Sequence, residues 1–367
     1  MSVGESMAAF PLVRALQQER PDLAIVVTTT TVTGAASVAR SLGESVLHVY
    51  FPYDLPWVLR RFVRTFRPRV LIILETELWP NTIDLCRRRG LRLILANARL
   101  SQASMRGYGL LPSLSRELVS GFDCIAAQGM RDRERFLALG AEPEKVEVTG
   151  SLKFDLVPPA SLREQAEVLR RTLGVNRPIL MLGSTREGEE GLLLDATAEL
   201  LIDFPNLLLI LAPRHPERFD EVAALCSTRG HRVARYAAGD ICTERTSVFL
   251  VDAMGELPRF YAAADIAFVG GSLRPFGGHN VLEPASLGIP VLCGPHTHNF
   301  AEICRLLEAA GALVVVDDVR SFVAAARRWL KDSNERDRVG QIGRDTVRQH
   351  RGATGRTVDL IRRHLPS

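Results

Sequence analysis

The chain has 367 residues, more than one compact core usually holds, so two domains are expected. Its composition, with 46% hydrophobic and 24% charged residues, is that of a soluble globular protein. No apolar run approaches the ~20 residues that cross a bilayer, which argues against a membrane-spanning protein. The six cysteines are scattered without a C-x-x-C pair, which predicts a reducing compartment and argues against zinc.

The net charge of +4 is unevenly distributed. Residues 1–155 hold 20 Lys and Arg against 16 Asp and Glu, and the remainder holds 26 of each. The excess of basic residues is concentrated in two arginine clusters. The first contains Arg60, Arg61, Arg64, Arg67 and Arg69, and the second contains Arg87, Arg88, Arg89 and Arg92. These clusters are either solvated helix faces or a surface for an acidic partner, such as phospholipid headgroups or a phosphorylated substrate.

The first 150 residues alternate helices with short, continuously apolar segments. Helices are expected at 7–19 and 57–66, and strands at 23–29, 46–50, 70–74, 91–96, 124–127 and 146–148. Apolar strands separated by helices predict a parallel sheet that is covered on both faces.

After a linker at 156–160, a second α/β series begins. Its expected strands are 179–183, 207–212, 231–234, 248–251, 266–269, 291–293 and 313–316. A last helix, at 354–364, is expected to pack back on the first half. Two doubly wound halves predict an enzyme with its site in a cleft between them, where ligands collect at the carboxyl ends of strands.

The stretch 264–295 joins a strand, a glycine-rich loop and a helix that is expected from Asn280 to Gly288. Such a corner presents backbone N–H groups and a helix N-terminus to an anion, which predicts a phosphate site. Glu283, one turn inside the helix, is placed to accept hydrogen bonds from sugar hydroxyls. Alternatively, Asn280 and Glu283 cap their own helix.

Two carboxylate motifs lie in the first half. Glu5 opens the first helix, where it is either part of a capping box with Ser2 or a general base for an attacking hydroxyl. Glu75 and Glu77 close an apolar strand and at that spacing point to the same side of it. A metal pair is conceivable there, but the chain has no Asp-x-Asp motif, and the alternatives are a site role or a structural salt bridge.

Lys153 precedes the linker and is one of only three lysines. It is predicted to neutralise a departing phosphate or a bound carboxylate, and the alternative is a surface pair with Asp155. Three strand-to-helix turns of the second half complete a predicted nucleotide pocket with the 264–295 corner. They are Gly183-Ser184-Thr185-Arg186-Glu187-Gly188-Glu189, Ala212-Pro213-Arg214-His215-Pro216 and Met254-Gly255-Glu256-Leu257.

Five motifs in order make the chain resemble the Kdo (3-deoxy-D-manno-octulosonic acid) transferase family. They are Ser2-Val3-Gly4-Glu5, Glu75-Thr-Glu77-Leu-Trp79-Pro80, Gly150-Ser-Leu-Lys153-Phe, Ala212-Pro213-Arg214-His215 and Gly277-Gly278-His279-Asn280-x-x-Glu283-Pro284. The resemblance implies an α/β GT-B fold, with two Rossmann-like doubly wound domains facing a central cleft. It also implies an inverting glycosyltransferase that moves Kdo from CMP-Kdo to lipid IVA in lipopolysaccharide biosynthesis.

By this resemblance, Glu5 is the catalytic base, and Glu75 and Lys153 stabilise the transition state. The implied donor-binding residues are Pro213, Arg214, Met254, Gly255, Glu256, Asn280, Val281, Leu282 and Glu283. No cofactor, metal or nucleic acid is implied. The implied partners are CMP-Kdo, lipid IVA and an anionic membrane surface, at the cytoplasmic face of the inner membrane.

The implied domains are an acceptor domain at 1–156, a CMP-sugar domain at 161–345 and a C-terminal helix at 346–367. The family begins with a membrane anchor and a first strand ahead of the Ser-x-Gly-Glu turn, and here only Met1 precedes that turn. One alternative is therefore an inactive or truncated nucleotide-binding remnant. Another is a transferase or epimerase of the same fold that uses a UDP-sugar.

Overall fold

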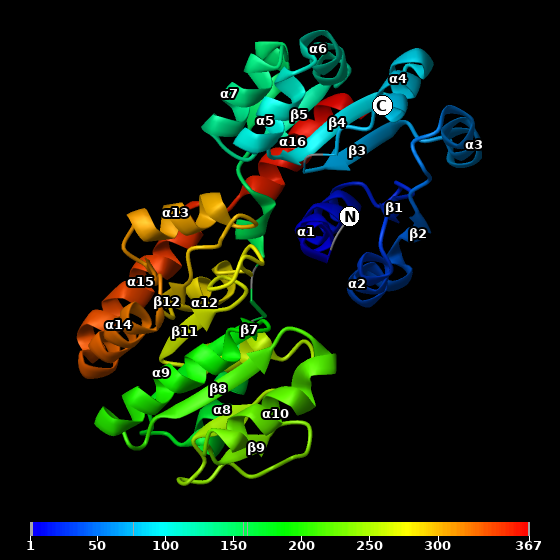
Figure 1. Cartoon of the computed structure of the whole chain (residues 1–367). Helices are drawn as coiled ribbons and strands as arrows, with labels where there is room; N and C mark the ends of the chain where they lie inside the picture. Colours follow the sequence, from blue (N-terminus) through cyan, green and yellow to red (C-terminus); the bar gives the residue numbers. More distant parts are fainter. Residues whose placement is uncertain (1–2, 76, 157, 160, 366–367) are drawn as a thin grey trace. The chain divides into compact units, whose positions relative to one another are not determined.

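The computed structural model describes residues 3–75, 77–156, 158–159 and 161–365, and of residues 3–7 it describes only the backbone. The chain forms two compact units (Figure 1). Unit 1 comprises Met1–Leu156 with His350–Ser367, and unit 2 comprises Val157–Gln349. The second division falls after Gln349 rather than at 345 because one helix, α15, runs unbroken over Ser333–Gln349.

Unit 1 contains two parallel sheets within the described residues, in the orders β1-β2 and β3-β4-β5-β6. The strands are β1 (Val26–Thr29), β2 (Leu47–Tyr50), β3 (Val70–Leu74), β4 (Arg92–Ala98), β5 (Cys124–Ala127) and β6 (Val146–Val148). The helices are α1 (Val3–Glu19), α2 (Val32–Leu42), α3 (Pro56–Phe66), α4 (Pro80–Arg89), α5 (Gln102–Gly109), α6 (Pro112–Ser120), α7 (Met130–Ala138) and α16 (Ala353–His364). Short 3-10 helices are η1 (Gly43–Ser45), η2 (Pro143–Lys145) and η3 (Leu152–Asp155).

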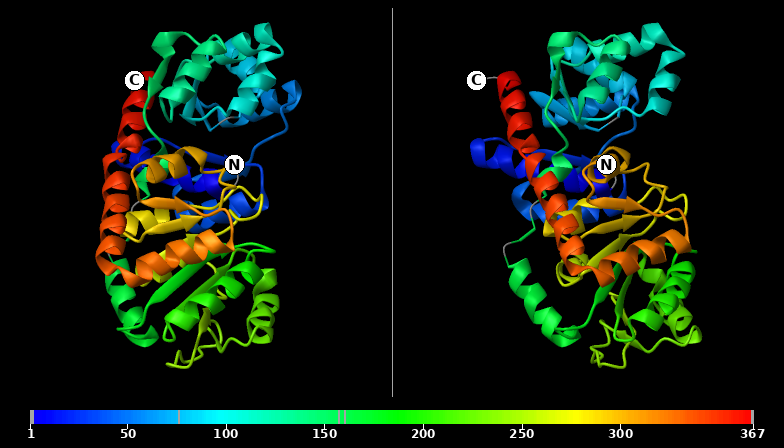
Figure 2. Two further views of the ribbon diagram at one scale, coloured as in Figure 1. Left: turned by 60° about the vertical axis from the view of Figure 1, so that its left-hand side comes forward. Right: turned by 90° about the vertical axis from the view of Figure 1, so that its left-hand side faces the viewer.

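The core of unit 1 ties both ends of the chain to the four-stranded sheet. Leu12 of α1, Ile94 of β4, Leu152 of η3 and Ile361 of α16 belong to one cluster of buried side chains. Figure 2 shows α16 from two further directions. Asp155 fixes the start of this helix, since its carboxylate accepts hydrogen bonds from Gly352 N at 2.6 Å and Thr354 N at 2.5 Å.

An apolar pocket of about 540 Å³ separates the two sheets of unit 1. Residues of β1 and β3 line it, together with α1 and α16. Among the described residues, β1 pairs only with β2 and β3 pairs only with β4. The facing edges of β1 and β3 are therefore not joined to each other.

Unit 2 has one seven-stranded parallel sheet among the described residues, in the order β13-β12-β11-β7-β8-β10-β9. Its strands are β7 (Ile179–Thr185), β8 (Leu208–Pro213), β9 (Val233–Arg235), β10 (Val248–Leu250), β11 (Ile266–Val269), β12 (Val291–Cys293) and β13 (Leu313–Val315). Its helices are α8 (Leu162–Leu173), α9 (Glu190–Asp203), η4 (Pro216–Arg218), α10 (Phe219–Thr228), α11 (Leu257–Ala262), α12 (Leu282–Leu287), α13 (Ala301–Ala309), α14 (Val319–Lys331) and α15.

Helices cover the unit 2 sheet in two groups. The helices α8, α11, α12 and α15 contact one another in succession, and α9 contacts both α10 and α14. Every residue of β7 is buried, as is expected of a central strand covered on both faces. Within the described residues, the helices are too short or too polar to cross a membrane.

Candidate functional site

Two residues that the sequence singles out meet in unit 1. Lys153 lies on η3, and Glu75 directly follows β3. Lys153 Nζ is 3.1 Å from Glu75 Oε1. The side chains of Lys153 and Glu75 are only 12% and 10% exposed. A buried charge is costly unless it is paired, and in this structure each of the two side chains provides the other with an opposite charge.

Glu75 has a left-handed backbone, with φ of 64°. The strand ends at Leu74, so the argument that Glu75 and Glu77 point to the same side of a strand is wrong. Glu77 instead accepts a hydrogen bond from Trp79 Nε1 at 3.3 Å. The spacing of two therefore gives no support to a metal pair at this position.

Asn97 connects the elements that carry Glu75 and Lys153, and the sequence analysis missed it. It is fully buried, and its Oδ1 accepts a hydrogen bond from Leu152 N at 3.0 Å. The preceding residue, Ala96, accepts from Glu75 N at 3.0 Å. Asn97 has φ of 52°, and the pairing of β4 with β5 shifts register there, which makes it a bulge. Asparagine tolerates this conformation better than most residues.

Glu5 lies on α1, but its side chain falls outside the described residues, as does Ser2. Its role as a base and its alternative role in a capping box therefore remain predictions.

In unit 2, the candidate site lies at the carboxyl ends of β7 and β11. In the sheet, β7 lies between β11 and β8. The chain continues from β7 to β8 and β10 on one side, and only later adds β11 on the opposite side of β7. A parallel sheet opens a crevice at such a switch in strand order. Gly270 N donates to Gly183 O at 2.8 Å, and Ser184 stands beside them with φ of 56°, where the pairing of β7 with β8 shifts register. This second bulge was also not predicted.

A cluster of cationic and imidazole groups gathers at this edge. Arg186 Nη1 lies 2.6 Å from His215 Nε2, and its guanidinium stacks on Phe276 at 4.3 Å from the ring centre. Burial, and then the charges of Arg214 and Arg186, lower the pKa of His279 to about 4. His279 is therefore neutral at pH 7. Arg186 and His215 belong to turns of the predicted nucleotide pocket, and His279 belongs to the fifth motif. None of the three was among the donor-binding residues that the family resemblance implied.

The residues Asn280 to Glu283 lie beside this cluster. Asn280 Nδ2 donates to Glu283 Oε1 at 3.1 Å, and its Oδ1 accepts from Leu282 N at 3.2 Å. The helix begins at Leu282 rather than near Asn280, and its N-cap is Val281, which makes no side-chain capping hydrogen bond. Asn280 and Glu283 therefore do not form the capping box that was the alternative. Burial raises the pKa of Glu283, against the lowering effects of Asn280 and Arg214. The side chains of Val281 and Leu282 are buried, and the carbonyl oxygen of Val281 accepts a hydrogen bond from Ala285 N at 3.3 Å.

The other predicted donor-binding residues lie at the ends of β8 and β10. Pro213 closes β8, and Arg214 N donates to Thr185 O at 2.9 Å. The segment Met254 to Glu256 follows β10, which β8 separates from β7. Met254 is half-exposed, and Glu256 pairs with Arg259 at 3.1 Å.

The glycine-rich loop after β11 already binds an anion, which is a side chain of the protein. The N–H groups of Gly271, Ser272 and Leu273 donate to the buried carboxylate of Glu189, at 2.7 to 2.9 Å. The prediction that these N–H groups bind a ligand phosphate is therefore wrong. Sequence offered no sign of this contact, because Glu189 lies 82 residues before Gly271.

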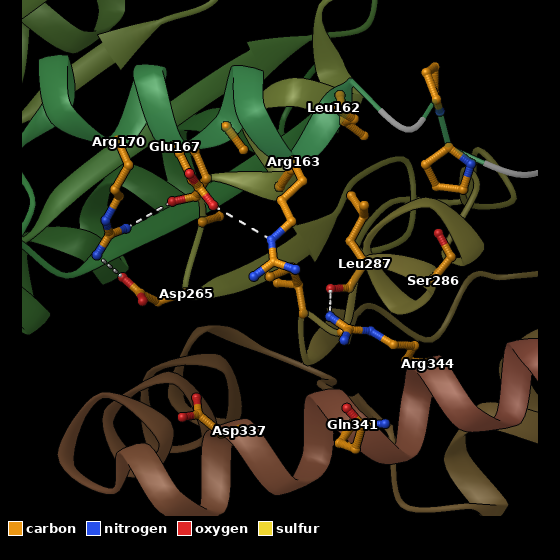
Figure 3. Close-up of a pocket in the computed structure, with 18 residues that line it drawn as sticks. Leu162, Arg163, Glu167, Arg170, Asp265, Ser286, Leu287, Asp337, Gln341 and Arg344 are labelled. Carbon is orange, nitrogen blue, oxygen red and sulfur yellow. Dashed lines mark hydrogen bonds and ion pairs between the residues drawn. The ribbon is translucent and has the colours of Figure 1, made fainter.

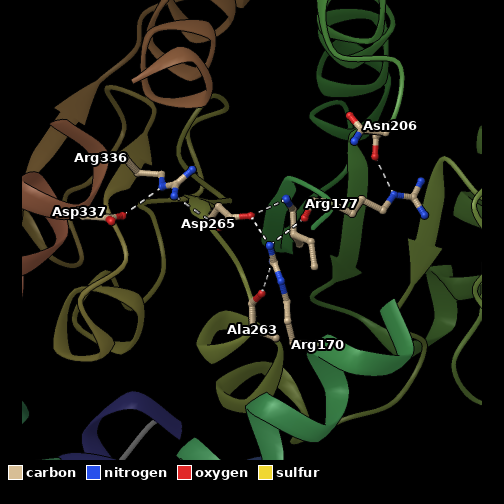
Figure 4. Close-up of polar contacts among 8 residues, drawn as sticks. Arg170, Arg177, Asn206, Ala263, Asp265, Arg336 and Asp337 are labelled. Atoms are coloured by element: carbon tan, nitrogen blue, oxygen red, sulfur yellow. Dashed lines mark hydrogen bonds and ion pairs between the residues drawn. The ribbon is translucent and has the colours of Figure 1, made fainter. Parts of the chain in front are cut away.

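A pocket of about 800 Å³ lies near the opposite, amino ends of β11 and β12 (Figure 3). Its cationic groups are used within the protein. Arg170 pairs with Asp265 at 3.0 Å and donates to Ala263 O, and Arg344 donates to Leu287 O at 2.6 Å. Figure 4 shows Asp265 among its partners. These guanidinium groups hold helix ends, which is a structural role.

Comparisons with known proteins agree with the motifs. The profile of the family described as 3-deoxy-D-manno-octulosonic-acid transferase matches residues 1–156, and the profile of glycosyl transferases group 1 matches residues 242–346. The 3-deoxy-D-manno-octulosonic acid transferase of Haemophilus influenzae is 42% identical over 365 residues, which cover 99% of this chain and 86% of that protein.

Two solved structures are also similar. The C-terminal CMP-Kdo binding domain of WaaA from Acinetobacter baumannii matches 52% of this chain and 99% of its own, with 33% identity and a TM-score of 0.50. UDP-GlcNAc 2-epimerase from Neisseria meningitidis matches 99% of this chain and 97% of its own, with a TM-score of 0.66. At 14% identity that likeness shows the fold alone. The predicted GT-B fold class is confirmed, and the UDP-sugar alternative is not favoured.

The family profile, the H. influenzae relative and the motifs all agree. The chain therefore belongs to the 3-deoxy-D-manno-octulosonic acid transferase family of glycosyltransferases.

Proposed function

We propose that this chain transfers Kdo from CMP-Kdo to the lipid A precursor lipid IVA, in lipopolysaccharide biosynthesis. The observation that carries this proposal is the 42% identity to a Kdo transferase across 99% of the chain. The donor is supported by a match at 33% identity, over 52% of this chain, to a domain whose name says that it binds CMP-Kdo.

The donor nucleotide binds to unit 2 in this proposal, at the carboxyl ends of β7 and β11. Arg214 is suited to the phosphate, because a guanidinium offers paired N–H donors to an oxyanion. Neutral His279 adds a hydrogen-bonding group without a charge of its own. Glu283 and the backbone of residues 280–282 are suited to the hydroxyls of a sugar, since carboxylate and carbonyl oxygens accept their protons.

The acceptor reaction uses groups of unit 1. Glu5 removes the proton of an acceptor hydroxyl, whose oxygen attacks the anomeric carbon of Kdo. The bond from that carbon to the CMP phosphate breaks, and CMP leaves with inversion. The buried pair of Glu75 and Lys153 supplies a fixed charge arrangement for the transition state, which costs no reorganisation during the reaction. No metal is required, in keeping with a chain that has no Asp-x-Asp motif.

The acceptor is met at an anionic membrane surface, at the cytoplasmic face of the inner membrane. Support comes from α3, whose Arg60, Arg61 and Arg64 are exposed. Trp57 and Tyr53, on and just before this helix, are 70% and 85% exposed. Arginines with exposed aromatic side chains are typical of a helix that lies on an anionic lipid surface.

To test this proposal, the chain is incubated with CMP-Kdo and lipid IVA, and the mass of the lipid product is measured by mass spectrometry. A gain equal to one or more Kdo residues, unchanged by EDTA, is expected. A parallel incubation with UDP-GlcNAc is expected to leave the lipid unmodified. Absence of any Kdo-bearing lipid from a folded chain that binds CMP contradicts the transferase reaction, whereas absence of CMP binding contradicts the donor site itself.

A further inference from the structure

Glu189 is a fully buried carboxylate at the carboxyl ends of β7 and β11. Its Oε2 accepts hydrogen bonds from Arg186 N at 2.9 Å and Gly271 N at 2.7 Å. Its Oε1 accepts from Ser272 N at 2.9 Å and Leu273 N at 2.8 Å. All four partners are backbone donors, and they come from two segments that are far apart in the sequence.

This arrangement suits an ionised carboxylate and no neutral substitute. An ionised carboxylate only accepts hydrogen bonds, whereas a glutamine amide would turn one of its two ends into a donor. The amide nitrogen would then face two N–H groups and leave them without an acceptor. Buried donors left without partners are costly, so the loop would have to move.

Glu189 holds the loop from which the donor-matching residues extend. Gly271, whose N–H it accepts, itself accepts a hydrogen bond from Gly278 N at 2.7 Å. Gly278 directly precedes His279 and Asn280. A side chain at Gly271 would lie 2.8 Å from the His279 ring, so the backbone passes directly against that imidazole. Movement of Gly271 would therefore displace His279 as well.

The same carboxylate holds the turn after β7. Its bond to Arg186 N closes that turn, and the Arg186 side chain reaches His215, in the turn after β8. Glu189 thus joins the backbone of the β7 turn to that of the β11 loop, and both contribute to the candidate donor site.

We propose that Glu189 is a positioning residue for the donor site. It serves as a permanent internal anion in a glycine-rich loop of the kind that elsewhere binds phosphate. By occupying these donors it fixes the loop before a ligand binds and directs the ligand's phosphate toward the side chains of Arg214 and His279. This inference rests on the proposed binding of CMP to unit 2.

Asp265 provides a matched control, because it joins β7 and β11 at their other ends. Its Oδ2 accepts from Ile179 N at 2.7 Å, the first residue of β7, and pairs with Arg170 at 3.0 Å. An Asp265→Asn variant therefore weakens the same two strands without touching the β11 loop. It measures what loss of stability alone does to nucleotide binding.

The experiment measures CMP binding by calorimetry for the full chain and for its E189Q, E189D and D265N variants. The CMP affinities of all four proteins are measured at one temperature, which lies below the thermal unfolding midpoint of the least stable protein. We expect E189Q to weaken CMP binding by about tenfold to a hundredfold, because small displacements in a preorganised site have effects of this size. E189D keeps the charge on a shorter stem and should bind CMP with intermediate affinity. D265N should bind CMP as the unmutated chain does.

In a transfer assay, E189Q should raise KM for CMP-Kdo while KM for the lipid and kcat change little. Amide hydrogen exchange should quicken at residues 271–273 in E189Q but not in D265N. Equal CMP affinity in E189Q and the unmutated chain overturns the role of Glu189 alone, and lack of CMP binding by the unmutated chain overturns the donor site. If E189Q does not fold, E189D decides: undiminished CMP affinity in that variant contradicts the inference.

Discussion

Lys153 Nζ lies 3.1 Å from Glu75 Oε1, so two residues that are 78 positions apart in sequence form one buried ion pair. Glu75 reaches this position from the left-handed backbone directly after β3, and Lys153 reaches it from η3. Asp155, two residues on, binds the start of α16. The pair is therefore fixed by the sheet on one side and by the C-terminal helix on the other.

Breaking this pair should cost stability as well as activity. Glu75→Gln leaves Lys153 buried beside a neutral group, and loss of one partner of a buried pair typically costs about 3–5 kcal/mol. We expect Lys153→Met to cost a similar amount and the double variant to cost less than the sum, in urea unfolding experiments.

The exposed pair of Lys145 and Glu142, at 2.9 Å, is the control. Lys145→Met should cost no more than about 1 kcal/mol, because exposed pairs contribute little. Additive costs for the two variants of the buried pair would show that Glu75 and Lys153 are not coupled.

Asn97 offers a separate test of how the pair is positioned. Both Asn97→Gly and Asn97→Ala remove the side-chain oxygen that accepts the hydrogen bond from Leu152 N. Glycine adopts the backbone φ of 52° without strain, whereas alanine does not. We expect the alanine variant to be less stable than the glycine variant by about 1 kcal/mol, because only alanine is strained in this conformation. Both should lower kcat, since η3 and Lys153 are released. Thermal unfolding and transfer assays measure the two effects, and equal stability of the variants would contradict the strain argument.

The strands were predictable because a buried parallel strand is a continuous apolar run. The predicted limits of β3, β5, β6, β11 and β12 agree with the structure, and most others differ by one to three residues. Two of these differences depend on hydrogen bonds rather than on apolar pattern, because Asn97 and Ser184 extend β4 and β7 through bulges that the runs of apolar residues do not contain.

The site was predictable to the extent that it follows strand ends. That rule located Glu75 and Arg214, which directly follow β3 and β8. It placed Glu189 in the turn that follows β7, but it did not predict that the Glu189 carboxylate binds a loop 82 residues away. Contacts of this kind depend on the packed sheet, which brings the ends of β7 and β11 together.

Acid should destabilise unit 2 through His279. Its pKa is lowered from 6.5 to about 4, so between these values the unfolded chain binds a proton that the folded chain does not. This contribution is fully present above pH 6.5 and is lost as the pH falls toward 4, by at most about 3 kcal/mol. The raised pKa of Glu283 acts in the opposite direction, because the folded state then retains a proton that the unfolded state has released.

Urea unfolding of the unmutated chain and of the His279→Gln variant, from pH 7 to pH 4.5, measures how much His279 contributes to the pH dependence of the free energy of unfolding. The variant should lose less stability over this range than the unmutated chain. Parallel curves for the two proteins would contradict a neutral, buried imidazole at position 279.

The arginines of α3 should control binding to anionic lipid. Each basic residue near such a surface contributes about 1 kcal/mol, so replacing Arg60, Arg61 and Arg64 by glutamine should weaken binding roughly a hundredfold. The measurement is sedimentation with vesicles of phosphatidylglycerol and phosphatidylethanolamine at low salt.

The control replaces Arg87, Arg88 and Arg89 of α4 by glutamine, which removes the same charge. Arg88 already pairs with Asp84 at 2.8 Å and Arg87 with Glu117 at 3.2 Å, so α4 presents less uncompensated charge than α3 does. We expect the α4 variant to bind vesicles more tightly than the α3 variant. Equal losses for the two variants would mean that binding follows net charge alone, and that α3 with its exposed Trp57 has no special part in it.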